Sequence, residues 1–462
     1  MHVLIVGSGY VGLTTGACLS FLGHEVVCYD VDQSKIDMLN SGQLPFYEPY
    51  LADLVLGEKE KGRLNFSMDL AGCVNQADFI FICVGTPSRN GNGFVDLTFV
   101  RQAALSIGQL MMPGKLRVIV NKSTVPVGSN GFVKNLVLEG LHIKRNGDGN
   151  NVDFATASNP EFLREGNAVF DSLYPDRIII GADDERATAM LRNLYMPIIK
   201  QDFTVPDSLP SRPTGFDIVP FICVDSTSAE VIKYAANAFL ATKISFINEI
   251  ANICQRVGAD IRRVSHGIGL DSRIGSRFLN AGLGWGGSCF GKDLRGLISN
   301  ALEYDYDPCL LKAVLDVNYR QRHICIKNLQ ETLKVIRGKT ITLWGLSFKP
   351  GTDDLRDAPA LDITSKLLEI EANIKVFDPV AMPAYRQICG NSGIQCVDDL
   401  YKAVENADGL IIVTEWPQFR DADWRKVKEK MRQPVIIDGR NLLNREELEA
   451  MGFVYRGVGI PS

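Results

Sequence analysis

Long hydrophobic runs and an excess of basic residues are both absent from this sequence. None of the apolar runs in its 462 residues approaches the roughly 18 residues that cross a bilayer as a helix. The chain has 49 Lys and Arg residues and 54 Asp and Glu residues, so its formal net charge at pH 7 is −5. A chain without a broad positive field attracts neither nucleic acid nor an anionic membrane, so we expect neither as a partner.

Paired cysteines are absent as well. The 11 cysteines are odd in number, and none belongs to a Cys-x-x-Cys motif. This pattern argues against a disulfide framework and a zinc site, and it favours reduced thiols in the cytoplasm. We expect all of them except Cys289 to be unreactive core residues. The apolar N-terminal run lacks a basic segment and turns to glycine at residue 7, so we interpret it as a strand entering a turn and not as a signal peptide.

Two parts of the chain alternate short apolar runs with spacers of helical length. Examples are HVLIVG (2–7), EVVCYD (25–30) and FIFICVGTP (79–87) in the first part, and KTITLWGLSFKP (339–350) and PVIIDGRN (434–441) in the second. Runs that are apolar on both faces predict parallel strands with crossover helices. We therefore predict an α/β protein with two doubly wound domains, residues 1–205 and 336–462, joined through residues 206–335.

A helix of about 30 residues is predicted between the two sheets. Its apolar residues follow the helical period, Thr227 and Glu230 match a capping box, and Gly258 is a suitable stop. We interpret this helix as a rod that joins the domains and offers part of its length to another subunit. The alternative is one buried helix inside a single large fold. The Pro- and Ser-rich residues 201–224 before it are interpreted as an interdomain loop.

The first apolar run leads into a glycine-rich turn. Gly7, Gly9 and Gly12 have the G-x-G-x-x-G spacing that lets a backbone approach a pyrophosphate at a helix N-terminus. Asp30 ends the next run, where an acidic residue accepts hydrogen bonds from a ribose and repels the extra phosphate of NADP. The pattern therefore predicts an NAD site. The alternatives are an ordinary tight turn and a solvated Asp30, whose role Asp32 could share.

Further cofactor contacts are predicted where strands end. Thr86 and Thr124 follow two of the predicted strands, and ligands of doubly wound sheets bind at such ends. Lys35 lies close enough to Asp30 to touch the adenosine side. Each of these residues could instead belong to ordinary turn or surface chemistry.

Cys289 has neighbours that a core cysteine does not need. It follows Gly286 and Gly287 and begins a predicted helix with Lys292 and Asp293 in its first turn. A helix N-terminus and a nearby lysine both favour the thiolate, which is the reactive form of cysteine. We therefore predict a reactive thiol, with a structural cysteine as the alternative.

Two further pairs have spacings that suit catalysis. Lys233 and Asn237 are four residues apart on the long helix, so both project from one side and could stabilise an oxyanion. Glu161 and Glu165 in NPEFLREG (159–166) follow a predicted strand. An exposed helical pair and a plain helix start are the respective alternatives.

Together these segments resemble the UDP-glucose/GDP-mannose dehydrogenase family. The motifs that carry the resemblance, in the order of the family, are VGSGYVGL, VGTP, KSTVPVG, NPEFLREG, EVIKYAANAFLATKISFINEI, GGSCFGKD, FKPGTDDLRDAP and IDGRN. The resemblance implies oxidation of the primary alcohol of a nucleotide sugar to an acid with two NAD per turnover. It also implies an N-terminal Rossmann domain, a long central helix used for dimerisation, and a C-terminal Rossmann-like domain for the sugar nucleotide. The segment NPEFLREGNAVFDSLYPDRIIIG is closest to the branch that acts on UDP-glucose, so the expected product is UDP-glucuronate.

The same resemblance implies a covalent mechanism. Cys289 would trap an aldehyde as a thiohemiacetal and carry it through a thioester, which water then hydrolyses. Lys233 and Asn237 would stabilise the developing oxyanion. Asp293 and Thr124 would organise water and proton transfer, and Glu161 would be an acid–base partner in thioester hydrolysis.

Binding residues also follow from the resemblance. The implied NAD contacts are Gly7, Gly9, Val11, Gly12, Asp30, Lys35, Thr86, Thr124, Glu165, Lys292 and Arg356. The implied sugar-nucleotide contacts are Glu161, Phe162, Leu163, Arg164, Lys233, Asn237, Phe278, Leu279, Asn280, Ala281, Gly282, Gly286, Phe348, Lys349 and Arg440, with Arg273 supplied by the neighbouring subunit of a homodimer.

Two alternatives and two departures from the family pattern accompany this interpretation. A GDP-mannose dehydrogenase would perform the same chemistry on another sugar nucleotide, and a non-catalytic NAD-binding sensor would need no thiol. Residue 50 is Tyr where the family usually has Gly, and residue 291 is Gly where Pro or Gln is common. Neither departure removes a residue assigned to catalysis.

Overall fold

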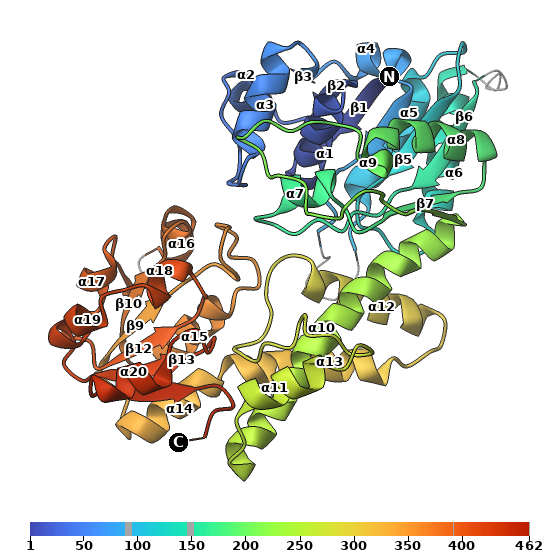
Figure 1. Ribbon diagram of the computed structural model, residues 1–462. Coiled ribbons are helices and arrows are strands. Elements are labelled where there is room, and N and C mark those ends of the chain that lie inside the picture. Colours follow the sequence, from blue (N-terminus) through green and yellow to red (C-terminus); the bar gives the residue numbers. More distant parts are fainter. Residues whose placement is uncertain (88–94, 146–151, 391, 462) are drawn as a thin grey trace. The chain divides into compact units, whose positions relative to one another are not determined.

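The computed structural model describes residues 1–87, 95–145, 152–390 and 392–461. The chain forms two compact units, Met1–Ala235 with Arg295–Asn300 and Ala236–Leu294 with Ala301–Ser462, and each contains its own sheet (Figure 1). The predicted α/β class is therefore confirmed. The predicted domain borders at residues 205 and 335 stay a prediction.

The sheet of the first unit has eight strands in the order β3-β2-β1-β4-β5-β6-β7-β8. Its strands are β1 (His2–Val6), β2 (Glu25–Tyr29), β3 (Leu64–Ser67), β4 (Phe79–Ile82), β5 (Arg117–Asn121), β6 (Phe154–Ser158), β7 (Ile178–Ala182) and β8 (Phe221–Val224). Neighbouring strands pair in parallel except β6 and β7, which are antiparallel. The strand order reverses between β1 and β4, and ligands of doubly wound sheets bind at such a switch point.

Helices cover both faces of this sheet. They are α1 (Tyr10–Phe21), α2 (Gln33–Asn40), α3 (Leu51–Glu60), α4 (Leu70–Gln76), α5 (Thr98–Leu110), α6 (Ser129–Arg145), α7 (Ala168–Leu173), α8 (Glu185–Leu194) and α9 (Met196–Lys200). Apolar residues of α4, α5 and α6 form one core cluster with the sheet, and those of α1, α2, α3, α7, α8 and α9 contribute to another. The doubly wound arrangement follows from strands that are buried on both faces, as the apolar runs predicted.

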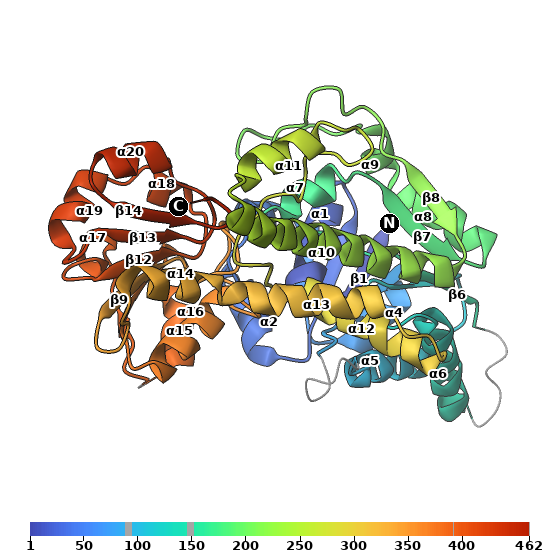
Figure 2. The ribbon, with the colours of Figure 1, turned by 90° about the horizontal axis from the view of Figure 1, so that it is seen from below.

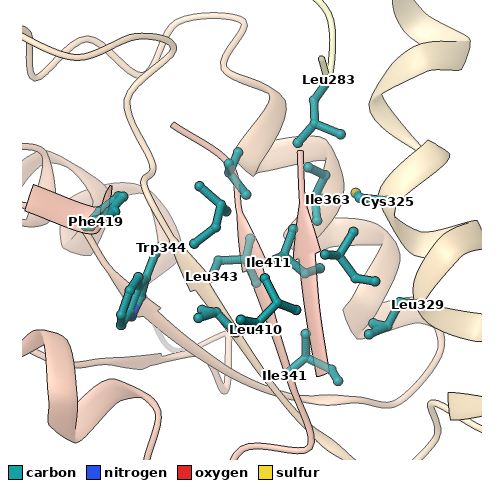
Figure 3. Close-up of a cluster of buried hydrophobic side chains, with 14 of the residues drawn as sticks. Leu283, Cys325, Leu329, Ile341, Leu343, Trp344, Ile363, Leu410, Ile411 and Phe419 are labelled. Atoms are coloured by element: carbon teal, nitrogen blue, oxygen red, sulfur yellow. The ribbon is translucent and has the colours of Figure 1, made fainter. Parts of the chain in front are cut away.

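The sheet of the second unit has six parallel strands in the order β11-β10-β9-β12-β13-β14. The strands are β9 (Thr340–Trp344), β10 (Asn373–Phe377), β11 (Gln395–Cys396), β12 (Gly409–Ile412), β13 (Val435–Asp438) and β14 (Val454–Gly457). Leu343 and Ile411 lie in the middle of the core around this sheet, and Cys325 and Leu329 reach it from a helix (Figure 3).

The remaining helices belong to the second unit or are shared between the units. They are α10 (Ser226–Val257), α11 (Ile261–Gly269), α12 (Phe290–Glu303), α13 (Cys309–Arg322), α14 (Ile324–Leu333), α15 (Pro359–Glu369), α16 (Met382–Cys389), α17 (Leu400–Ala403), α18 (Pro417–Arg420), α19 (Trp424–Lys430) and α20 (Arg445–Ala450). The division into units runs through α10 and α12.

Helix α10 confirms the predicted rod, but its start differs from the prediction. It has 32 residues and ends before Gly258, whose φ of 80° suits a helix stop. Its first turn is capped by Asp225, which accepts from the amide of Ser228 at 2.8 Å, so the predicted Thr227–Glu230 capping box is wrong. The later part of α10 packs against α13, where Ser245 donates to the carbonyl of Val314 at 2.9 Å (Figure 2). Across the described ranges, no helix is both long and apolar enough to cross a membrane.

Candidate functional site

The turn between β1 and α1 combines close packing with one open position. A Cβ at Gly7 would lie 2.8 Å from the carbonyl oxygen of Cys83, and a Cβ at Gly12 would lie 1.9 Å from that of Gly7. At Gly9 a Cβ would meet no atom within 4 Å. Gly9 is also the N-cap of α1 and provides no capping side chain for the first-turn amides, which include that of Val11. The turn therefore leaves both space and hydrogen-bond donors for an anion, so these residues fit a pyrophosphate.

Asp30 occupies the position expected of a ribose-binding acid. It is buried, and its carboxylate accepts from the amide of Ser8 at 2.8 Å and from the ammonium of Lys35 at 2.8 Å. Asp32 instead caps α2 by accepting from the amides of Ser34 and Lys35. The structure thus separates two roles that the sequence left open, because Asp32 serves the helix while Asp30 faces the glycine turn.

The ends of β4 and β5 are joined beside a small pocket. The hydroxyl of Thr86 donates to the carbonyl oxygen of Thr124 at 2.8 Å. The pocket is lined by Asn121, Lys122, Ser123, Thr124, Val125, Ser158, Pro160, Glu161, Glu230, Lys233 and Tyr234. It therefore contains three residues that the sequence nominated for catalysis, Thr124, Glu161 and Lys233.

Glu161 and Lys233 form a buried ion pair in this pocket. Their side chains are 5% and 7% exposed, and Lys233 Nζ lies 2.9 Å from Glu161 Oε1. Glu161 also accepts from the amide of Leu163 at 2.7 Å. Burial alone would raise the pKa of Glu161, but Lys233, this amide and the charge of Lys122 together hold the pKa below its usual value. The carboxyl is therefore ionised, and its lowered pKa makes it a weaker base than an ordinary glutamate.

The segment that follows Glu161 is held by a residue that sequence reasoning missed. Glu48 is buried and accepts from the amides of Gly166 and Ala168, both at 2.7 Å, and from the hydroxyl of Tyr10. Burial and the neighbouring Glu48 raise the pKa of Tyr10, so its hydroxyl stays protonated as a donor. No local motif marks Glu48, because its partners are 38 to 120 residues away in the chain.

Other predicted residues of this segment have different surroundings. Glu165 is buried. The centroid of the Phe162 ring lies 4.0 Å from the guanidinium of Arg177 and 5.5 Å from Lys233 Nζ. Arg164 pairs with Asp171 at 2.6 Å and is 56% exposed. The side chain of Arg164 is therefore held toward α7.

In the second unit, Cys289 is the N-cap of α12 and is half-buried. Its Sγ lies 3.6 Å from the hydroxyl of Ser288, and its carbonyl accepts from the amide of Asp293 at 2.9 Å. The thiol is therefore at a helix N-terminus, as predicted, and it is not sealed in the core. Cys223 and Cys309 are exposed, so the expectation that every other cysteine is a core residue is wrong for these two.

Asp293 is bound by the amide that the sequence nominated. Asn237 Nδ2 donates to Asp293 Oδ2 at 2.6 Å, and both residues are buried. Lys233 and Asn237 thus have different partners although they lie one turn apart on α10. The predicted i, i+4 pair is present, and each member is fixed by a carboxylate.

The glycine-rich segment before Cys289 is buried and fastened at several points. Gly282 donates to Asn248 Oδ1 at 2.8 Å, Trp285 donates to Asn318 Oδ1 at 2.8 Å, and Gly287 donates to the carbonyl of Arg356 at 2.9 Å. A Cβ at Gly287 would lie 2.8 Å from the ring of Phe348. Sequence reasoning missed Asn248 and Asn318, whose only local signal is an amide within an otherwise amphipathic helix.

Arg440 reaches the same glycine-rich segment from the loop after β13. Its Nε donates to the carbonyl of Val413 at 2.7 Å and its Nη1 to that of Gly284 at 3.0 Å. Its Nη2 is buried and has no hydrogen-bond partner among the described residues. Lys349 Nζ lies 5.4 Å from the centroid of the Phe348 ring. The carboxylate of Glu415 lies 3.3 Å from Arg440 Nε, so the guanidinium already has one anionic neighbour. The buried Nη2 still needs an acceptor, which fits an anionic ligand.

The other predicted residues of this unit are more exposed or belong to the backbone. Arg273 pairs with Asp271 and is 87% exposed, and Arg356 pairs with Asp354 and is 63% exposed. Lys292 is half-buried in the first turn of α12. In the segment 278–282, Phe278 has a φ of 64°, Leu279, Ala281 and Gly282 are buried, and Asn280 is exposed; Gly286 is buried as well.

Three family models match the chain in sequence order. They describe the NAD binding domain (residues 1–199), the central domain (227–320) and the UDP binding domain (342–445) of UDP-glucose/GDP-mannose dehydrogenases. The chain belongs to this family. The NAD binding domain contains the glycine turn and Asp30, so the predicted cofactor is confirmed as NAD.

Relatives within the UDP-glucose/GDP-mannose dehydrogenase family match over the full chain. The UDP-glucose 6-dehydrogenase TuaD of Bacillus subtilis is 43% identical over 100% of this chain and 93% of its own length. A UDP-glucose 6-dehydrogenase of Rhizobium meliloti is 41% identical over 100% of both chains. The structure of a UDP-glucose dehydrogenase from Pyrobaculum islandicum is 36% identical, with a TM-score of 0.86 over 99% of this chain and 98% of that one.

The third family model, the UDP binding domain, matches residues of the second unit. The UDP binding domain includes Phe348, Lys349, Arg356 and Arg440, which the resemblance had nominated. The roles of individual site residues stay predictions. Among the described residues, no group of three His, Cys, Asp or Glu side chains could hold a metal ion.

Proposed function

We propose that this chain oxidises UDP-glucose to UDP-glucuronate with two NAD per turnover, through intermediates bound to Cys289. The observation that carries the chemistry is the half-buried thiol at the N-terminus of α12, one turn from an Asp293 that is bound by Asn237. A helix N-terminus favours the thiolate, which is the nucleophilic form. The substrate is supported by the full-length relatives named UDP-glucose 6-dehydrogenase.

The proposed reaction has two oxidations and one hydrolysis. NAD, when bound, accepts the hydride that leaves C6 of the glucose in each oxidation. The Cys289 thiolate adds to the C6 aldehyde after the first oxidation and gives a thiohemiacetal, and the second oxidation converts this into a thioester. Water then attacks the thioester, which releases the carboxylate and restores the thiol.

Each polar residue of the site has a proposed task in catalysis. Lys233 and Asn237 donate hydrogen bonds to the oxygen on which negative charge develops. Glu161 accepts protons, which is supported by its ionised state beside Lys233. Asp293 and Thr124 orient the water that attacks the thioester.

The proposal also divides the binding of the two ligands. Gly7, Gly9, Val11, Gly12, Asp30, Lys35, Thr86, Thr124, Glu165, Lys292 and Arg356 hold NAD. The uridine diphosphate and the sugar are held by Phe162, Leu163, Arg164, residues 278–282, Gly286, Phe348, Lys349 and Arg440. The buried Nη2 of Arg440 supports an anion at this position, because it finds no acceptor among the described residues.

We further propose a homodimer that forms along α10. Phe239, Phe246, Ile253 and Val257 are 65%, 51%, 49% and 71% exposed and recur at intervals that keep them near one side of the helix. An exposed apolar stripe of this kind supports packing against a second copy of the chain. Arg273, which is 87% exposed, is then available to the site of the neighbouring subunit. We also propose a reducing, cytoplasmic setting, which is supported by the lack of a disulfide between any of the 11 cysteines, all of which lie in the described ranges.

One experiment tests the substrate and the stoichiometry together. Purified protein is mixed with NAD and a limiting amount of either UDP-glucose or GDP-mannose, and NADH is followed by its absorbance. We expect two NADH per UDP-glucose and little reaction with GDP-mannose. One NADH per sugar would contradict the four-electron reaction, and faster turnover of GDP-mannose would replace the proposed substrate.

The first mutational prediction concerns the thiol. Cys289→Ser should retain NAD binding and lose at least about 100-fold in steady NADH production, because an alcohol is a far weaker nucleophile than a thiolate. Cys309→Ser, which changes an exposed cysteine outside the site, is the matched control and should behave like the parent. Turnover at the parental rate by Cys289→Ser would show that covalent catalysis is wrong.

A further inference from the structure

Lys122 is a buried lysine in the catalytic pocket that has no role in the reaction described above. It directly follows β5, is 9% exposed, and lines the pocket with Thr124, Glu161 and Lys233. Its Nζ donates to Asn159 Oδ1 at 3.0 Å. A buried ammonium is costly, so its presence here needs a physical reason.

The amide that receives Lys122 is itself fixed by the sheet. Asn159 Nδ2 donates to the carbonyl of Ile179 at 2.9 Å, and the backbone amide of Asn159 donates to the carbonyl of Asn121 at 2.9 Å. This arrangement leaves Oδ1 as the acceptor for two donors, Lys122 and the hydroxyl of Tyr195 at 2.6 Å. The ammonium is therefore held in place by a neutral group, which orients its charge without neutralising it.

Glu161 supplies the negative charge that favours the charged form of Lys122. Burial and the charge of Lys233 lower the pKa of Lys122, and the carboxylate of Glu161 opposes this by favouring the charged form. Conversely, Lys122 is one of the groups that lower the pKa of Glu161, after Lys233. Glu230, the other carboxyl of the pocket, is engaged by the amides of Gly128 and Asn130 at 2.6 and 2.9 Å. The pocket thus contains two lysines around one available carboxylate.

We propose that Lys122 is a positioning residue that keeps Glu161 ionised and in place while Lys233 turns to the reacting oxygen. This inference rests on the proposed function for the task of Lys233. An ammonium that must stabilise an oxyanion cannot also be the sole counter-ion of a neighbouring base. Lys122 supplies a second positive charge for Glu161. Its own ammonium donates to Asn159, so it need not move when Lys233 turns to the oxyanion. The charged or titratable groups that face this pair are Cys83, Tyr195, Glu230, Lys233 and Tyr234.

The test compares three variants of the full-length enzyme. Lys122→Met removes the charge, Lys122→Arg keeps it, and Tyr195→Phe removes the other hydrogen bond to Asn159 Oδ1 without changing charge. The titration of Glu161 is followed by NMR in protein labelled with carbon-13 at the Glu carboxyls, with Glu161→Gln to assign the signal. Steady-state kinetics are measured over the same pH range.

Loss of the positive charge should move the titration of Glu161 to higher pH in Lys122→Met. Since the ionised form is the base, activity falls as the pH drops through the pKa of Glu161, so the acid limb of the kcat profile should move to higher pH as well. We expect kcat to fall on the order of tenfold on the acid limb, at pH values below the raised pKa of Glu161, with kcat at neutral pH and KM for NAD nearly unchanged. Lys122→Arg should restore most of kcat on the acid limb, and Tyr195→Phe should leave the Glu161 titration where it is in the parent.

The outcomes separate this inference from the proposed function. An unchanged Glu161 titration in folded Lys122→Met overturns the role of Lys122, even if the enzyme oxidises UDP-glucose as proposed. A shifted titration in a protein that does not oxidise UDP-glucose overturns the proposed function and retains the charge coupling. If Lys122→Met does not fold, Lys122→Gln carries the same test, because its amide can still donate to Asn159.

Discussion

The two sheets begin with the same backbone arrangement and then diverge. Gly7 after β1 has a φ of 103° and donates to the carbonyl of Tyr29, and Gly345 after β9 has a φ of 94° and donates to that of Phe377, both at 2.8 Å. The next amide binds the acid at the end of the neighbouring strand in both units, Ser8 to Asp30 at 2.8 Å and Leu346 to Asp378 at 2.7 Å. One strand-turn geometry is therefore used twice.

The two units differ in the chain segment after each glycine. In the first unit α1 begins at Tyr10, directly after the turn, whereas in the second unit α15 begins only at Pro359. Asp30 accepts from two amides and from Lys35. Asp378 accepts from the amides of Leu346, Ser347, Val380 and Ala381, from the hydroxyl of Ser347 and from the indole of Trp416.

The number of hydrogen bonds that a carboxylate accepts from the protein decides whether it can also bind a ligand. The oxygens of Asp378 are occupied by the loop that it organises, so this carboxylate is a structural element of the second unit. Asp30 has fewer protein donors and lies beside an open glycine turn, so it retains capacity for a ribose. The same residue type at the same fold position thus retains capacity for a ligand in one unit and shapes a loop in the other.

The largest effect should come from the structural acid. Asp378→Ala removes the acceptor of several buried donors, and we expect a loss of roughly 3–5 kcal/mol in the free energy of unfolding of the second unit. Urea unfolding followed by circular dichroism measures this, and NAD affinity should change little. A mild effect on stability together with weaker NAD binding would remove the proposed distinction between the two acids.

A smaller but more specific effect should follow from filling the open turn. Gly9→Val should weaken NAD binding by about 100-fold, or about 2.7 kcal/mol, because its side chain would occupy the space for the pyrophosphate. Stability should be nearly unchanged, since Gly9 has ordinary extended dihedral angles and no atom within 4 Å of its Cβ position. Calorimetric titration with NAD, alongside a thermal melt, checks both parts.

The smallest effect is expected at Asp30. Asp30→Ala should weaken NAD binding by roughly tenfold, the value of one charge-assisted hydrogen bond. Asp30→Ala should also reduce the preference for NAD over NADP. The carboxylate that repels the extra phosphate is removed, and Lys35 loses its ion-pair partner. The ratio of kcat/KM for the two cofactors measures this preference. A ratio equal to that of the parent would show that Asp30 does not select the cofactor.

Local features of the site could be predicted from the sequence, and distant ones could not. The turn Gly7–Gly12, Asp30 and the stop of α10 at Gly258 depend on neighbours within one strand-turn-helix or one helix end. The capping box failed because Glu230 binds the amides of Gly128 and Asn130, which are 102 and 100 residues away. Residue types and their spacing do not predict a contact between residues that are so far apart in the chain.

The same limit explains the residues that were missed. Glu48, Lys122 and Asn318 act through partners that only the folded chain brings near them. Lys233 and Asn237 were predicted from helical spacing, yet the carboxylates that hold them could not be inferred from it. The resemblance to a family supplied roles for many residues at once, but it supplied no account of how the pocket balances its charges.

Arg440 has a consequence for how ligand binding and reactivity are connected within the second unit. A guanidinium is flat and rigid, so a ligand that fixes one of its edges also fixes the direction of the other. Its Nη1 is bonded to Gly284, five residues before the thiol, while its Nη2 awaits an acceptor. A diphosphate bound there would restrict the backbone that leads to Cys289, so binding of the nucleotide part of a substrate would also fix the position of the thiol.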